Sequence, residues 1–227
     1  MMPAMTELTV LRVFVGPDGA GGNPLGVFLD GPAVPSDRRQ DVAADLDFSE
    51  TVFVDDDAGS VEVYTPTRPI PFAGHPLVGT AWLLAAQGAG VDVLRPPAGE
   101  VATWEEDGLR WIRAQPAWSP VMDLVRYGDP ATVEQLGGPP AGSEFTYCWA
   151  WIDESDGAVR ARAFAPSYGV PEDEATGSAA VRLVATLGRP LTIRQGAGSE
   201  LRARPGPNGM AEVGGKVAIV ERRDYPA

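Results

Sequence analysis

Alternation of apolar and polar residues is the most regular feature of this sequence, and it recurs in many short segments. Apolar residues at every second position predict half-buried strands, and clusters of Gly, Asn, Asp and Pro between them predict turns. We therefore expect strands at residues 9–15, 27–29, 52–54, 61–65, 101–104, 109–112, 145–152, 159–165, 191–194, 201–204, 210–213 and 217–220. The last four are spaced like successive hairpin strands.

Only four segments have helical composition. Residues 36–44 form one, with Ser36 as the N-cap, and residues 130–136 form another within a crossover at residues 118–140. The two most apolar helices open at Gly74 and at Gly177, and each is closed by a later glycine. Many strands around two apolar helices predict an α+β fold.

Residues 66–88 resemble residues 166–188 at a constant offset, 166 − 66 = 100. Both segments run from an apolar strand through a Pro-rich turn to a glycine beside small or polar residues, and then into an apolar helix. We interpret this as a duplicated half-domain. The predicted halves are residues 1–115 and 116–227, pseudo-symmetric, each with a mostly antiparallel sheet around a central helix. We allow for the extreme C-terminus to pack back on the N-terminal half.

Composition narrows the range of functions. The formal net charge is −13, which argues against nucleic acid as a partner, because binding phosphates needs clustered Lys and Arg. No stretch is apolar enough to span a membrane and the N-terminal residues lack a signal-peptide pattern, so we expect a cytoplasmic protein. The single Cys148 excludes an internal disulfide, and one cysteine with one histidine leaves no zinc cluster, so no metal site is expected.

The two helix starts are candidate binding elements. Unpaired backbone N–H groups and the positive end of the helix dipole lie there, so two starts facing one cleft would suit a substrate carboxylate. Ordinary helix capping explains the same residues, since Pro, Ser and Thr are routine at helix starts. Spacing alone favours capping.

Three polar side chains lie where strands give way to turns or helices: Glu50, His75 and Asp173. Each has an ordinary explanation. Glu50 resembles a solvated carboxylate at a strand end, and His75 could cap its helix. Asp173 lies in an acidic run that is typical of a solvated loop. None of the three is decisive alone.

Together these motifs resemble the PhzF-like family of phenazine-biosynthesis isomerases and their relatives. The pattern is F-S-E-T-V-F-V at residues 48–54, P-F-A-G-H-P at residues 71–76 and G-V-P-E-D-E-A-T-G-S-A at residues 169–179. Further matches are G-N-P-L at residues 22–25, Q-G at 195–196 and G-G-K-V at 214–217. The resemblance covers nearly the whole chain. It implies the diaminopimelate-epimerase-like fold, with the active site between the two halves.

The resemblance also implies roles for particular residues. Glu50 matches the carboxylic acid that takes a proton from one carbon of a conjugated acid and returns it to another. His75 and Asp173 match the other polar active-site positions. The matches to substrate-holding positions are Gly74, Gly177 and Ser178, and we count Asn23, from the G-N-P-L match, with them. Neither helix start carries a cysteine, so a two-thiol racemase is excluded.

We therefore expect a cofactor-independent isomerase that moves a proton within a small unsaturated amino or hydroxy acid in secondary metabolism, and, from the resemblance alone, a homodimer. Such a mechanism requires burial of Glu50, because desolvation would raise its pKa toward that of a useful base. An epimerase using Glu50 with Asp173 or His75, and a non-catalytic binding protein, stay open. Pro69 replaces the family's usual acidic residue and residues 198–201 depart from its G-R-P-S stretch, so a phenazine precursor need not be the substrate.

Overall fold

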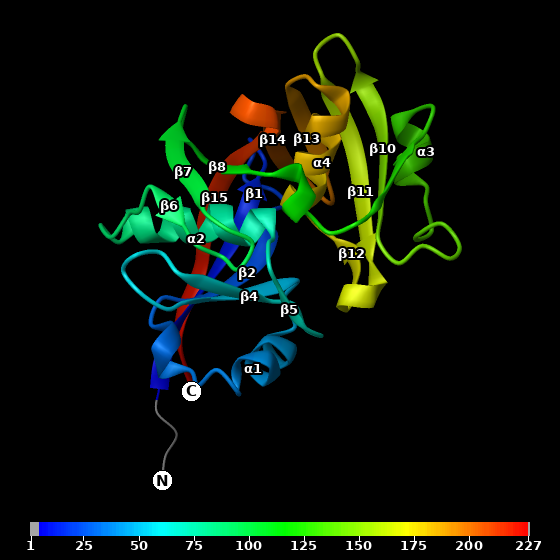
Figure 1. Cartoon of the computed structure of the whole chain (residues 1–227). Helices are drawn as coiled ribbons and strands as arrows, with labels where there is room; N and C mark the ends of the chain where they lie inside the picture. The colour runs from blue at the N-terminus through cyan, green and yellow to red at the C-terminus, as the bar shows by residue number, and fades with distance from the viewer. Residues whose placement is uncertain (1–4, 227) are drawn as a thin grey trace.

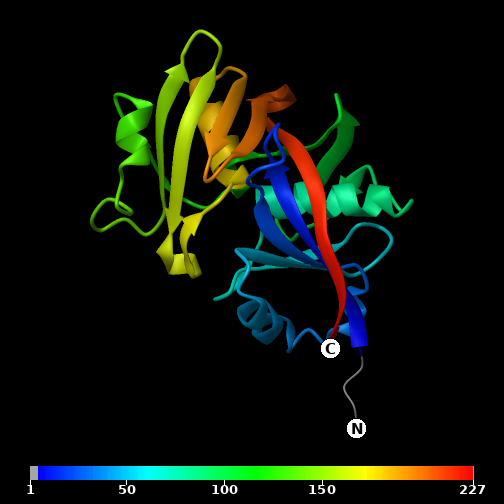
Figure 2. The same cartoon turned by 180° about the vertical axis from the view of Figure 1, so that it is seen from behind.

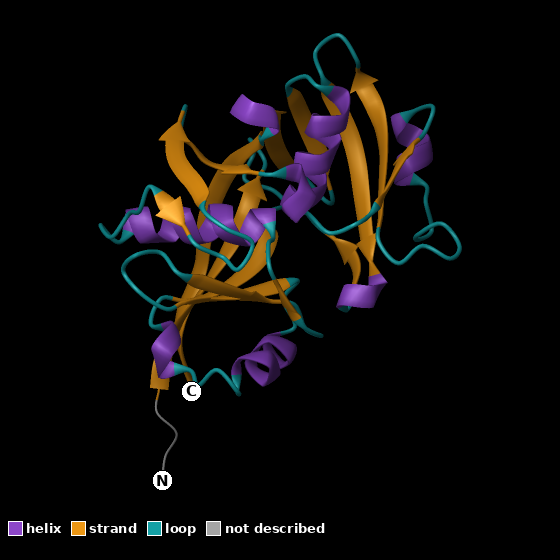
Figure 3. Ribbon diagram, in the orientation of Figure 1, coloured by secondary structure: helices purple, strands orange, loops and turns teal. Residues whose placement is uncertain are grey.

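Two buried helices, α2 (Gly74–Ala86) and α4 (Gly177–Leu187), are enclosed by strands of one continuous sheet (Figure 1). The structure is a computed structural model and describes residues 5–226. The main path through the sheet runs β5-β4-β3-β2-β1-β15-β14-β13-β11-β10-β9. Its first strands curve around α2 and its last strands curve around α4, as Figure 3 shows. This is the predicted α+β fold.

The strands of the first part of the chain are β1 (Met5–Val15), β2 (Asn23–Phe28), β3 (Glu50–Val54), β4 (Val61–Tyr64), β5 (Pro69–Ile70), β6 (Val93–Leu94), β7 (Val101–Glu106) and β8 (Leu109–Ala114). Those of the second part are β9 (Asp123–Arg126), β10 (Thr146–Asp153), β11 (Ala158–Ala165), β12 (Val170–Asp173), β13 (Leu191–Gln195), β14 (Ser199–Pro205) and β15 (Ala211–Pro226). Most neighbouring strands are antiparallel; the pairs β2–β3, β9–β10 and β11–β13 are parallel.

The two central helices follow the sequence closely. Helix α4 has the predicted bounds, and it ends because Gly188 adopts the left-handed conformation with φ 66° and donates its N–H to the Val184 carbonyl. Helix α2 is buried on nearly every side, which explains its almost uniformly apolar sequence. The prediction for residues 36–44 was less accurate: α1 (Arg39–Leu46) begins after Arg38, so Ser36 is not its N-cap.

Strand β15 corrects the prediction of two hairpin strands at residues 210–213 and 217–220. It is one strand of 16 residues, because Gly214 and Gly215 have extended backbone and no turn interrupts them. Residues 211–215 pair with β8, and residues 216–226 pair with β1. Figure 2 shows this strand passing beside β1 toward the chain termini. Because β15 belongs to both halves, the division at residue 115 stays a prediction.

Four strands lie outside the predicted ranges: β5 and β6, which have two residues each, and the longer β9 and β12. Strand β9 lies in the predicted crossover and pairs in parallel with β10. Strand β12 occupies the acidic run that we interpreted as a solvated loop, and it pairs with β11, where Asp173 lies opposite Ala163. This pairing buries Asp173, which is 7% exposed. The short helix α3 (Pro130–Glu134) lies in the predicted helical segment, with Asp129 accepting a hydrogen bond as its N-cap.

One hydrophobic core joins the two halves, since side chains of α2 and α4 belong to the same cluster of buried residues. A smaller cluster lies under α1, where Phe28 and Phe53 stack with ring centroids 5.1 Å apart. No described helix is long and apolar enough to cross a membrane.

Gly214 generates a stability prediction, because β15 packs there without space for a side chain. A Cβ atom on Gly214 would lie 2.5 Å from the Trp111 ring and 2.9 Å from the Arg110 carbonyl oxygen. We expect Gly214→Ala to lower the free energy of unfolding by about 1–3 kcal/mol, measured by urea denaturation. Gly128→Ala is the control, since a Cβ atom on Gly128 would have no neighbour within 4 Å among the described residues. Equal stability of the two variants would contradict the packing argument.

Candidate functional site

The starts of α2 and α4 touch. A Cβ atom on Gly74 would lie 2.7 Å from the Gly177 Cα atom, and one on Gly177 would lie 2.7 Å from the His75 backbone nitrogen. Only glycine fits at either position. Neither helix start, as described, has a hydrogen bond from a capping side chain, which argues against the ordinary capping interpretation. Two positive dipole ends and their backbone N–H groups therefore meet at one point between the halves.

Glu50 begins β3, which pairs in parallel with β2 and directs this side chain toward the helix starts. Its side chain is 14% exposed, and its Oε2 atom lies 3.3 Å from the His75 Nε2 atom. Neither atom has a hydrogen-bond partner within residues 5–226, so this is a close approach without hydrogen-bond geometry. Burial, and then the charge of Asp173, raise the Glu50 pKa well above its ordinary value, while Ser49 acts in the opposite direction.

His75 lies in the first turn of α2 and is 2% exposed. Desolvation lowers its pKa to about 3, against a smaller opposing effect of a hydrogen bond with the Pro24 backbone. The imidazole is therefore neutral at physiological pH. Its contact with Glu50 is accordingly a contact between a carboxyl group and a neutral ring rather than an ion pair.

Asp173 approaches the same point from β12. Its Oδ1 atom accepts a hydrogen bond from Asn23 Nδ2 at 2.7 Å, and its Oδ2 atom accepts one from Thr176 Oγ1 at 2.6 Å. Burial raises the Asp173 pKa, and these two hydrogen bonds oppose that effect. The structure thus brings Glu50, His75 and Asp173 together, as the sequence predicted.

Asn23, on β2, connects the halves. Its amide nitrogen donates to Asp173 and, at 2.9 Å, to the Ala175 carbonyl, and its amide oxygen accepts from Ser49 Oγ at 2.7 Å. The same nitrogen lies 3.3 Å from His75 Nδ1. The amide is therefore occupied by protein groups. A substrate-binding role for Asn23 stays a prediction.

A small cavity of about 30 Å³ lies between the halves at this point. One side is polar, with Glu50, Asp173 and Ser178, and the rest is largely apolar and aromatic; its full lining is Ser49, Glu50, Ile70, Phe72, Ala73, Pro120, Phe145, Ala165, Tyr168, Val170, Asp173, Thr176 and Ser178. This volume holds about one water molecule. A ligand larger than water therefore needs the groups around this cavity to move.

Two turns, one from each half, contact each other beside this cavity, which Tyr168 lines. The Arg68 guanidinium lies 4.0 Å from the centroid of the Tyr168 ring. Gly169, with φ 80°, approaches Thr67 so closely that a Cβ atom would lie 3.0 Å from its methyl group. The two turns are equivalent in the repeat noted in the sequence, so the repeated segments face each other beside the cavity.

Sequence reasoning missed three residues that support the site. Ser49 and Thr176 line the cavity, and Gln195 hydrogen-bonds Thr176 from behind. Signals for them existed, since Ser49 precedes Glu50, Thr176 precedes Gly177, and Gln195 lies in a motif match. What the sequence does not provide is the hydrogen bonding of Thr176 with Gln195 and of Ser49 with Asn23, which depends on the tertiary fold.

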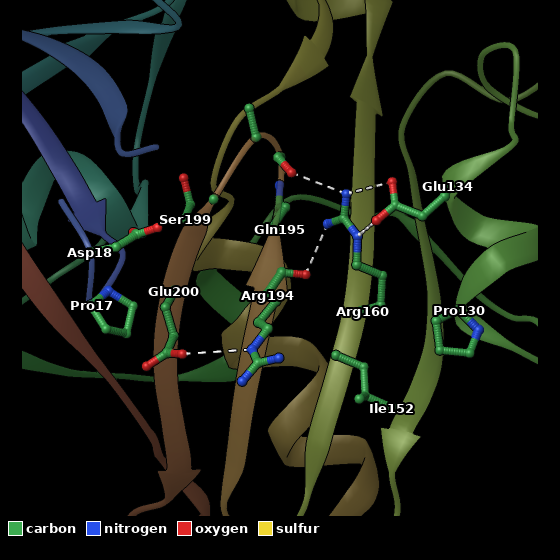
Figure 4. A pocket seen from close by; sticks show the side chains of 13 residues that line it. Pro17, Asp18, Pro130, Glu134, Ile152, Arg160, Arg194, Gln195, Ser199 and Glu200 are labelled. Carbon is green, nitrogen blue, oxygen red and sulfur yellow. Dashed lines mark hydrogen bonds and ion pairs between the residues drawn. The ribbon is translucent and has the colours of Figure 1, made fainter. Parts of the chain in front are cut away.

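A wider hollow of about 630 Å³ lies beside β13 and α3 and is drawn in Figure 4. Its guanidinium groups already have acidic partners: Arg160 is hydrogen-bonded to Glu134, and Arg194 lies 3.8 Å from Glu200. Within residues 5–226 no group of His, Cys, Asp and Glu side chains is arranged to hold a metal ion. We place the candidate site at the helix starts, where the perturbed pKa values converge.

Comparison with known proteins identifies the family. The family model described as phenazine biosynthesis-like protein, PhzC-PhzF, matches residues 14–134. The chain belongs to this family. The resemblance inferred from the motifs is therefore confirmed.

Curated relatives of this PhzC-PhzF protein carry isomerase names. The trans-2,3-dihydro-3-hydroxyanthranilate isomerase of Pseudomonas aeruginosa is 31% identical over 216 residues, which cover 77% of this chain and 77% of the relative. An uncharacterized isomerase of Deinococcus radiodurans is 28% identical over 239 residues, which cover 81% of this chain and 76% of the relative. The expectation of an isomerase is thus confirmed at the level of the family.

Solved structures confirm the fold. A PhzF-family protein of Enterococcus faecalis superposes with a TM-score of 0.79 at 18% identity, over 98% of this chain and 99% of that chain. A probable proline racemase of Agrobacterium radiobacter has a TM-score of 0.65 at 12% identity, over 96% and 92%. At such identities the likeness concerns the fold alone, and it supports the predicted epimerase-like architecture.

The protonation state of His75 can be tested directly, because His75 is the only histidine in the chain. In untagged protein, nitrogen-15 NMR of the imidazole should show a neutral ring from pH 8 to pH 4 and a midpoint at about 3. The unfolded chain protonates this residue near pH 6.5, so His75 lowers the free energy of unfolding as the pH falls through the interval between these values. Glu50→Gln should leave the ring neutral, since burial is the main cause. A midpoint near 6.5 in the folded protein would contradict this description.

Proposed function

We propose that this protein is a cofactor-independent isomerase that moves a proton between two carbons of a small unsaturated amino- or hydroxy-carboxylic acid. The observation that carries the proposal is the Glu50 carboxyl group, whose buried Oε2 atom is unpaired among the described residues, in a small cavity where two uncapped helix starts meet. Family membership supports the isomerase class. Secondary metabolism, a cytoplasmic location, a homodimer and the absence of a cofactor stay predictions.

The proposed mechanism assigns different tasks to the two sides of the cavity. Backbone N–H groups at Gly74 and Gly177, with the Ser178 hydroxyl, hold the substrate carboxylate. The unsaturated carbons then lie beside Glu50, which takes a proton from one carbon as the double bonds shift and returns it to another. No atom is gained or lost. A raised Glu50 pKa matches the carboxyl group better to carbon-bound hydrogen, and the small cavity keeps the transferred proton from exchanging with water.

A second candidate is an epimerase. It is favoured by one observation, namely that Glu50 from one half and Asp173 from the other both line the cavity, as two bases acting on opposite faces of one carbon would require. Reaction in deuterium oxide distinguishes the candidates. Deuterium at the alpha carbon with inversion would establish the epimerase, whereas a shifted double bond with retained substrate hydrogen would establish the isomerase.

The relatives give a first probe for the substrate. Several are named trans-2,3-dihydro-3-hydroxyanthranilate isomerase, and their identity with this chain is about 30%. The chain departs from the family motif at Pro69 and at residues 198–201. We therefore propose the wider class of small unsaturated amino and hydroxy acids, with the named compound as its first member to test.

Glu50→Gln tests the proposed shuttle. The variant keeps the shape of the side chain but has no basic carboxylate, so we expect turnover to fall by about 10²-fold to 10⁴-fold while ligand binding persists. Turnover is followed by proton NMR on a panel of unsaturated acids, and binding by titration calorimetry. Glu144→Gln, at an exposed position, is the matched control and should keep full activity. Near-normal turnover by Glu50→Gln would contradict the shuttle and would mean that another residue is catalytic.

Recognition of the substrate carboxylate is a separate prediction. The protein is strongly acidic, so recognition depends on short-range donors at the helix starts rather than on long-range attraction. We expect the methyl ester or amide of a substrate to bind at least about tenfold more weakly than the acid, near 1.4 kcal/mol. Calorimetry on the matched pair measures this, and Ser178→Ala should reduce the difference. Equal affinity for acid and ester would show that these donors do not hold the carboxylate.

A further inference from the structure

Gln195 is the most fully hydrogen-bonded side chain behind the candidate site. It ends β13 and is 1% exposed. Its Nε2 atom donates to the Asp173 backbone carbonyl and to Thr176 Oγ1, both at 2.8 Å. Its Oε1 atom accepts from the Thr176 backbone N–H at 3.2 Å and from the Tyr147 hydroxyl at 3.1 Å. Both N–H donors and both acceptor positions of this amide are therefore occupied.

The orientation of this amide is determined by its partners. A backbone N–H can only donate and a backbone carbonyl can only accept, so Oε1 must face Thr176 N and Nε2 must face the Asp173 carbonyl. The Thr176 hydroxyl oxygen therefore receives a hydrogen bond from Gln195. Its own hydrogen is free for Asp173 Oδ2, which lies 2.6 Å away. Gln195 thus sets the direction in which Thr176 donates.

Asn23 acts in the same way on the other carboxyl oxygen. The Ala175 carbonyl can only accept, which fixes the Asn23 amide nitrogen toward it and toward Asp173 Oδ1 at 2.7 Å. Asp173 therefore receives one oriented donor on each oxygen. Such an arrangement stabilises a carboxylate, since a protonated carboxyl group would lose one of these contacts.

Glu50 is in the opposite situation. Its Oε2 atom is buried without a hydrogen-bond partner among the described residues, and the neighbouring His75 ring is neutral. Two carboxyl groups in one small cavity disfavour double ionisation, so the second of the pair to ionise does so at a higher pH than it would alone. The other titratable groups facing Asp173 are Glu174, next to it in the chain, and the Tyr147 hydroxyl from β10. Neither supplies a positive charge.

We propose that Gln195 and Thr176 are positioning residues that hold Asp173 as the ionised member of the pair and thereby leave the higher proton affinity, which a base needs, to Glu50. This deepens the proposed function and rests on it for its purpose, because it distinguishes the fixed anion from the residue that moves a proton. The same arrangement disfavours the symmetric use of Glu50 and Asp173 as two interchangeable bases.

The experiment measures both carboxyl groups without substrate, in the full chain, by carbon-13 NMR titration. Signals are assigned with Asp173→Asn and Glu50→Gln. In the unaltered protein Asp173 should ionise at lower pH than Glu50. Thr176→Val removes the donated hydrogen bond, so the Asp173 midpoint should rise by about one pH unit, a tenfold change in its protonation constant, and the Glu50 midpoint should fall.

Three further variants separate positioning from general loss of structure. Thr176→Ser keeps the hydroxyl and should keep both midpoints. Gln195→Leu should shift them in the same direction as Thr176→Val. Thr146→Val is the matched control, since that buried hydroxyl has no hydrogen-bond partner within residues 5–226, and its removal should change neither midpoint.

Two results would overturn the proposal: Glu50 ionising before Asp173 in the unaltered protein, or equal midpoints in Thr176→Val and Thr176→Ser. If Gln195→Leu does not fold, the comparison of Thr176→Val with Thr176→Ser still tests the proposal. The outcome is separable from that of the proposed function. Full activity of Glu50→Gln would refute the shuttle while leaving the measured order of ionisation intact. Conversely, loss of activity in Glu50→Gln together with Glu50 ionising before Asp173 would refute only the positioning role of Gln195 and Thr176.

Discussion

The contact between Gly74 and Gly177 is the constraint on which the rest of this structure depends. Two helices can meet start to start only if neither carries a side chain at the point of contact, and a Cβ atom on either glycine would overlap the backbone of the other helix. The contact places uncapped N–H groups in the interior. Such groups need partners, and the proposed substrate carboxylate would supply them.

The same contact explains why one continuous sheet covers both helices. Both helices are apolar and must be covered, and they are covered by one sheet because β15 pairs with strands of both halves. Sharing that strand fixes the halves at one side of the site. Beside the candidate cavity, the halves also meet through the cation–π contact of Arg68 with Tyr168, which at an exposed position contributes only about 0.5–1 kcal/mol. The halves are therefore joined strongly by the shared strand and weakly by this contact.

Local patterns predicted much of this fold. The apolar helices were found because their composition, opening glycines and closing glycines agree, and Gly188 ends α4 in the conformation that only glycine adopts easily. Strand β15 was divided in error because Gly214 and Gly215 resemble a turn, whereas here they avoid Trp111 and Phe14. Whether a glycine provides a turn or space for a neighbour is decided by tertiary packing, which a single sequence does not display.

At the candidate site, too, the sequence predicted some features and the tertiary fold determines the others. Glu50, His75 and Asp173 were predicted from motif resemblance, but their local sequence indicated solvated or capping groups. Asp173 in particular lies in an acidic run, and its burial results from the pairing of β12 with β11 and from hydrogen bonds that arrive from distant segments. Residue type indicated the chemistry. The electrostatic state of each group required the fold.

Enclosure of the cavity and assembly of the site depend on the same contacts. The cavity is small, and separation of the elements around it would break the hydrogen bonds from Asn23 to Asp173 and to the Ala175 carbonyl. In an open state water would reach both carboxyl groups, so burial would no longer raise the pKa of Glu50. Closing restores the oriented donors on Asp173 and removes water from Glu50 together. In the proposed mechanism, Glu50 therefore has its altered proton affinity when the substrate is enclosed, which protects the transferred proton.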